Sequence, residues 1–238
     1  MKISDLVDAL KAFFFDVLGF LIPGFYCILI LSFLVLPQYK FEFDYGGLNK
    51  EWNSSILVII SYILGYCLYP LSDWSDKIIF RFKFLKLKTQ SQVESDIDSS
   101  TELAICKVAL TELLLKNDST PVIPAVALDN MSARNLRSII MSYIPEVDTK
   151  IYTFMFRSEL CRLISSFTLF ISLLGLLLSI VNNIVISKIL LKSDFKSIAV
   201  YSLLLLSCYF LTKARMRFLS IAYKIPFSIF IAKYFKIT

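Results

Sequence analysis

Small and polar residues recur at regular spacing in one apolar stretch, residues 163–187, and they are the first candidates for chemistry. Steps of three, four, three, four and three residues place side chains in one nearly straight seam on a helix. The seam consists of Ser165, Thr168, Ser172, Gly175, Ser179 and Asn182. Because a polar seam gains nothing from contact with lipid, we expect it to face protein or water.

Two interpretations of the seam remain open at this point. Small residues let membrane helices approach closely, and hydroxyl groups add weak hydrogen bonds between helices, so the seam is typical of a packing surface. In a homo-oligomer, the same residues would meet their symmetry copies around an aqueous axis and line a pore. Hydroxyls and a carboxamide suit that place because they hydrate an ion without binding it tightly.

Four arginines are the candidates for ligand recognition: Arg134, Arg137, Arg157 and Arg162. The first two share one face of an expected helix, and the other two come just before the apolar stretch. A guanidinium group binds two phosphate oxygens at once, so these residues predict a site for an anionic or nucleotide-derived ligand. The alternative is that all four are solvated or lie among lipid headgroups.

The sequence shows no residue pattern typical of catalysis or of metal binding. The chain has no histidine, which excludes histidine general bases and every zinc site that uses histidine. Its five cysteines form no Cys-x-x-Cys pair, and no nucleotide-binding, hydrolase or metalloprotease motif occurs. We therefore expect no enzyme, no catalytic residues, no cofactor and no metal site.

The composition predicts an all-α integral membrane protein. Of 238 residues, 57% are hydrophobic, and the mean hydropathy is +0.69, which is too apolar for an ordinary soluble domain. Four apolar runs are long enough to cross a bilayer as helices. They cover residues 17–36, 54–71, 163–187 and 195–212.

These runs divide the chain into four parts. Residues 1–71 hold an amphipathic surface helix and the first two spans, and residues 72–162 form a helical cytoplasmic region. Within that region, residues 89–101 are Ser-rich and acidic and predict a flexible linker. We expect a helix over residues 102–116, and another that begins after Asp129 or Asn130 and ends near Tyr143. Residues 163–212 hold the third and fourth spans, and residues 213–238 form a basic tail at the membrane interface.

The basic residues predict the orientation of the chain. Of the 25 Lys and Arg residues, all but five lie in the N-terminus, the central region or the tail. The five exceptions are Lys40, Lys50, Lys188, Lys192 and Lys196. Because positive charge accumulates in cytoplasmic loops, both termini and the central region are expected in the cytoplasm.

The layout resembles membrane components of bacterial anti-phage defence systems, such as the Hailong channel component and the Kiwa membrane subunit. The resemblance is carried by four spans, the cytoplasmic insertion, DVLGFLIPG at residues 16–24 and RSELCRLISS at residues 157–166. The Hailong likeness implies an oligomeric inner-membrane pore, with a tetramer favoured, that dissipates the membrane gradient. It also implies a nucleotide-derived or short nucleic-acid ligand made by a partner nucleotidyltransferase. A non-conducting scaffold or sensor that signals to a soluble partner is the alternative function.

Overall fold

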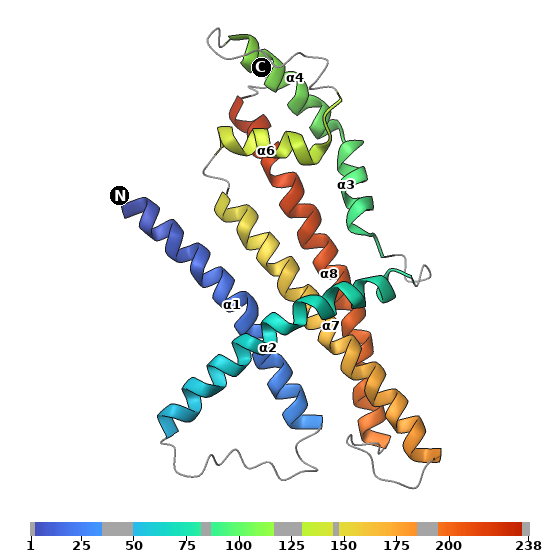
Figure 1. Cartoon of the computed structure of the whole chain (residues 1–238). Coiled ribbons are helices and arrows are strands. Elements are labelled where there is room, and N and C mark those ends of the chain that lie inside the picture. The colour runs from blue at the N-terminus through green and yellow to red at the C-terminus, as the bar shows by residue number, and fades with distance from the viewer. Residues whose placement is uncertain are drawn as a thin grey trace. The chain divides into compact units, whose positions relative to one another are not determined.

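The chain folds into α-helices throughout the part that the structure describes. This computed structural model describes residues 3–34, 50–81, 87–116, 130–144, 148–184 and 195–234. Within them lie α1 (Ile3–Leu34), α2 (Lys50–Ile79), α3 (Gln90–Asp98), α4 (Thr101–Lys116), α6 (Ala133–Tyr143), α7 (Asp148–Ile184) and α8 (Phe195–Tyr234). Figure 1 shows these helices in chain order from blue to red.

Four of these helices are long and apolar enough to cross a membrane, which confirms the predicted fold class. The candidate spans are Phe13–Leu34, Ser55–Ile79, Lys150–Val181 and Ser197–Tyr234. One detail differs from the sequence prediction. The expected surface helix and the first span form a single uninterrupted helix, α1, because Ile3 and the apolar residues after it continue the same helical pattern.

The chain divides into two compact units, each with its own core. Unit 1 comprises Met1–Lys86 and Glu159–Ala214, and therefore contains α1, α2, most of α7 and the first half of α8. Its buried core contains Cys27, Leu34, Leu68, Leu163, Phe167, Ile171 and Tyr201. Large apolar side chains also cover its exterior; for example, Phe33 is 76% exposed and Leu203 is 66% exposed. Apolar surface of this extent is expected where lipid replaces water.

In unit 1, α1 and α2 cross with their backbones in contact (Figure 1). The crossing depends on two glycines, Gly24 and Gly65. A Cβ atom at Gly24 would overlap the carbonyl of Ser61 and would lie 2.9 Å from the Gly65 nitrogen. A Cβ atom at Gly65 would overlap the carbonyl of Phe20. Only glycine permits so close an approach of two backbones.

Unit 2 comprises Leu87–Ser158 and Arg215–Thr238, and it contains α3, α4, α6, the start of α7 and the end of α8. Its fully or almost fully buried side chains include Val93, Ile97, Leu103, Cys106, Leu110, Leu136, Ile140, Ile151, Phe227 and Phe230. The expected linker at residues 89–101 is largely helix α3, because Thr89 and Gln92 form a capping box and Val93 and Ile97 are buried.

The start of α6 also differs from the sequence prediction. Ser132 occupies the N-cap position but makes no side-chain capping bond, and Asp129 lies outside the described residues. Instead, a carboxylate oxygen of Asp98, from the end of α3, accepts a hydrogen bond from the Ala133 amide at 2.6 Å. A remote side chain therefore satisfies one of the free N–H groups at this helix end.

Helices α7 and α8 each belong to both units. The division falls after Ser158 within α7 and after Ala214 within α8, and both helices are unbroken there. The expected interfacial tail is thus the last part of α8 up to Tyr234. Its Phe227 and Phe230 are 1% and 0% exposed, so this segment supplies core side chains to unit 2.

Candidate functional site

The polar seam of α7 is buried inside unit 1. Ser165, Thr168, Ser172 and Ser179 are at most 2% exposed. Gly175 faces the ring of Tyr201 on α8, so closely that a Cβ atom would lie 2.6 Å from the ring Cζ. The side chain of the sixth predicted residue, Asn182, lies outside the described residues.

Side chains and backbone groups of the same chain satisfy the hydrogen bonds of the seam. Thr168 and Tyr26 of α1 share a hydroxyl–hydroxyl bond of 2.8 Å. The Cys208 thiol of α8 donates to the Ser165 carbonyl at 3.4 Å. Ser172 and Ser179 donate to carbonyls of their own helix. In the single chain, the seam is therefore arranged as the packing interpretation predicts, with α1 and α8 against it.

Arg162 lies in a cluster of carboxylates rather than in an open ligand site. Its guanidinium donates to Asp73, to Asp76 at 3.1 Å and to Glu159 at 3.4 Å. The Tyr69 ring lies below it, 5.6 Å from the guanidinium carbon to the ring centroid. Three carboxylates surround this side chain, which is only 14% exposed, and they balance its positive charge within unit 1. The predicted ligand contact at Arg162 therefore lies within an acidic cluster, and it stays a prediction.

This cluster fastens α2 to α7 within unit 1. Beside it, the hydroxyls of Ser75 and Ser166 form a buried hydrogen bond of 2.7 Å. Nothing local in the sequence links Asp73 and Asp76 to an arginine that follows them by 89 and 86 residues. The only local signal was that Glu159 precedes Arg162 by three residues, a spacing that allows an ion pair on a helix.

Arg157 is exposed at the start of α7, in unit 2. Its guanidinium carbon lies 5.7 Å from the centroid of Phe154 and 5.9 Å from that of Phe218. Stacking of this kind suits a solvated arginine that covers aromatic surface. Arg157 thus contacts aromatic rings within unit 2, whereas Arg162 pairs with carboxylates within unit 1.

Arg134 and Arg137 occupy neighbouring turns of α6, as predicted, but their environments differ. Arg134 is exposed, whereas Arg137 is half-buried beside the core residue Leu136. The Arg137 guanidinium carbon lies 4.8 Å from the centroid of the Tyr223 ring. Its Nε atom is buried and has no hydrogen-bond partner. Burial lowers the pKa of Arg137, because removal from water disfavours the charged form.

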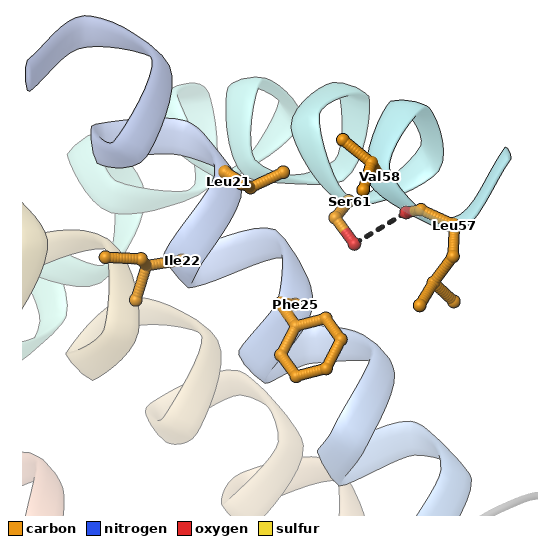
Figure 2. Close-up of a pocket in the computed structure, with 6 residues that line it drawn as sticks. All are labelled: Leu21, Ile22, Phe25, Leu57, Val58 and Ser61. Carbon is orange, nitrogen blue, oxygen red and sulfur yellow. Dashed lines mark hydrogen bonds between the residues drawn. The ribbon is translucent and has the colours of Figure 1, made fainter. Parts of the chain in front are cut away.

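An apolar groove lies between α1 and α2 in unit 1, beside the glycine crossing (Figure 2). It has a volume of about 240 Å³ and is lined by Leu21, Ile22, Phe25, Leu57, Val58 and Ser61. The Ser61 hydroxyl donates to the Leu57 carbonyl at 2.8 Å, as the dashed line in Figure 2 shows. Because the Ser61 hydroxyl donates within its own helix, the groove has no free polar donor for a charged ligand. Its apolar lining is suited to a hydrocarbon chain.

Within the described residues, no group of three or more His, Cys, Asp or Glu side chains could hold a metal ion. Comparisons of the chain with protein-family models, with curated proteins and with solved structures found no match. Two features of the described chain therefore remain as candidates for function: the buried helix contacts of unit 1 and the arginine surface of α6.

Proposed function

We propose that this chain is a multi-pass membrane signalling subunit that relays events at unit 2 to the membrane helices of unit 1. In this proposal, unit 2 and both termini are cytoplasmic, and the membrane is the bacterial inner membrane. The distribution of basic residues supports that orientation. A soluble cytoplasmic partner receives or supplies the signal.

The continuity of α7 and α8 carries the proposal. These helices have 37 and 40 residues, which at 1.5 Å per residue makes them about 56 and 60 Å long. The hydrocarbon core of a bilayer is only about 30 Å thick. Roughly half of each helix is therefore available to a unit outside the membrane. Because Ile151 of α7 and Phe227 and Phe230 of α8 are core residues of unit 2, repacking that core moves the same helices that form unit 1.

Hydrogen exchange on the full chain in lipid nanodiscs tests the relay. Ile140→Ala opens a cavity at a fully buried site in the unit 2 core and should loosen it. We expect faster exchange also in α7 beyond Glu159. Ile105→Ala on the exposed face of α4 is the matched control, because Ile105 is 40% exposed. Loosening confined to unit 2 would contradict the relay.

An oligomeric pore-forming effector in anti-phage defence is the second candidate. One observation favours it: the hydroxyls of Ser172 and Ser179 donate to carbonyls of their own helix, so in the described chain these two groups hold no second helix in place. In a homo-oligomer, a rotation of α7 would bring the seam toward the axis. A ligand that binds unit 2, made by a partner nucleotidyltransferase, would drive that rotation.

Leucine at Ser172 separates the two candidates when conductance and assembly are measured on the same purified protein. A pore loses conductance and keeps its oligomeric size, since leucine closes a polar channel. A signalling subunit has no conductance to lose and is destabilised, because leucine does not fit a fully buried serine site.

A further inference from the structure

Arg137 is the one arginine of the four candidates whose burial the described part of the chain leaves uncompensated. Its Nε atom is closed off from solvent without a hydrogen-bond acceptor. No carboxylate of the described residues forms an ion pair with it. Arg162, by contrast, is surrounded by three acidic side chains. A buried guanidinium nitrogen without a hydrogen-bond acceptor is uncommon in folded proteins and calls for an explanation.

The Tyr223 ring that contacts Arg137 belongs to a residue whose hydroxyl group bonds to a carboxylate. The Tyr223 hydroxyl donates to a carboxylate oxygen of Glu94 at 2.9 Å, and the Gln90 amide donates to the same oxygen at 3.2 Å. Tyr223 thus holds Glu94 with its hydroxyl and supports the Arg137 guanidinium with the face of its ring. The ring therefore supports the guanidinium, while Glu94 accepts hydrogen bonds from Tyr223 and Gln90.

We propose that the α6 surface formed by Arg137 and Arg134 binds a phosphate group. The terminal amino groups of Arg137 supply a planar fork that matches two phosphate oxygens. Arg134, one turn earlier on α6 and exposed, adds a second positive charge on the same face. Because the Tyr223 ring supports the Arg137 fork in advance, less conformational entropy is lost when the phosphate binds.

The phosphate comes from one of two sources, a soluble phosphorylated molecule or the headgroup of an anionic lipid. Both present the same oxygens to the two arginines. The inference deepens the proposed function, since it names the chemistry that unit 2 recognises. The site itself does not depend on whether binding is relayed to unit 1.

Site-resolved arginine modification tests the inference and separates the sources. The full chain in nanodiscs is treated with phenylglyoxal, and the reaction of each arginine is followed by mass spectrometry. Inorganic pyrophosphate added to phosphatidylcholine nanodiscs is the soluble probe, and nanodiscs that contain phosphatidylglycerol are the lipid probe. We expect one of them to slow the reaction of Arg134 and Arg137, while the exposed Arg157 reacts at an unchanged rate.

Variants then test the role of each side chain, with whichever of the two probes slows the modification of Arg134 and Arg137. Arg137→Lys keeps the charge but loses the fork, and it should weaken binding about tenfold or more, as should Arg134→Ala. Arg157→Ala is the matched control and should bind as the wild type does. Unchanged modification of Arg134 and Arg137 with both probes would overturn the inference. Equal weakening by Arg157→Ala would also overturn it. Protection without altered exchange in unit 1 would refute the relay and leave the site standing.

Discussion

Alanine at Gly24 is the sharpest perturbation of the membrane unit, because its added Cβ atom meets only backbone. That atom would overlap the Ser61 carbonyl and would lie 2.9 Å from the Gly65 nitrogen, well inside ordinary van der Waals contact. A flexible side chain could rotate away from the added Cβ atom. Backbone atoms cannot, so the two helices must move apart to accommodate it. Overpacking a core typically lowers the free energy of unfolding by about 1–3 kcal/mol and occasionally by more. For Gly24→Ala we expect the upper end of this range, about 3 kcal/mol. That corresponds to roughly a 150-fold shift of the unfolding equilibrium.

The assay is equilibrium unfolding of the purified chain in mixed micelles. Gly65→Ala, whose Cβ atom would overlap the Phe20 carbonyl, should cost a similar amount. Leu203→Ala is the control. Because Leu203 is 66% exposed, its replacement should change the free energy of unfolding little. If the free energy of unfolding of Gly24→Ala lies within about 0.5 kcal/mol of the wild-type value, the backbone contact between α1 and α2 is refuted.

Three further predictions follow from single side chains. Arg162→Met should lower the free energy of unfolding by about 2–4 kcal/mol, because it removes the ion pair with Asp76 (19% exposed); Arg162→Met combined with Asp76→Leu should recover part of this in the same unfolding assay. Burial raises the pKa of Cys106 from 9.0 to about 12, so its thiol should react with maleimide at pH 8 about a thousandfold more slowly than in the unfolded chain. Its rate should rise with pH, and equal rates in the folded and unfolded chain would contradict its burial. A cysteine at Gly47, outside the described residues, should react only from the periplasmic side; reaction from the cytoplasm alone would reverse the predicted topology.

The four spans could be predicted because their signal is local. A run of about 20 apolar residues is sufficient evidence for a span, and no distant residue alters it. The same reasoning misjudged residues 89–101. Their polar composition concealed two apolar residues four apart, Val93 and Ile97, which are almost fully buried in unit 2. The Thr89 and Gln92 capping box was visible in the sequence and could have indicated α3.

The candidate site could be predicted only in part, because the environment of each arginine depends on contacts with residues far away in the sequence. The sequence identifies arginines but not their partners. Arg162 meets Asp73 and Asp76 from α2, and Arg137 meets Tyr223 from the end of α8. Carboxylates therefore balance the charge of Arg162, whereas no carboxylate of the described residues pairs with Arg137. Nothing in the sequence around either arginine indicates this difference. In the polar seam, Ser165, Thr168, Ser172 and Ser179 are buried, and their neighbours on α1 and α8 are known only from the fold.

The most direct test of the account is the reactivity of a cysteine at Ser172 in a chain otherwise free of cysteine. A membrane-impermeant methanethiosulfonate reagent is applied to each side of sealed vesicles in turn. Our account, in which the seam packs against helices of the same chain, predicts no reaction from either side, because Ser172 is 0% exposed. Rapid reaction from one side, with the protein still folded, would show that the seam faces water and would contradict that account.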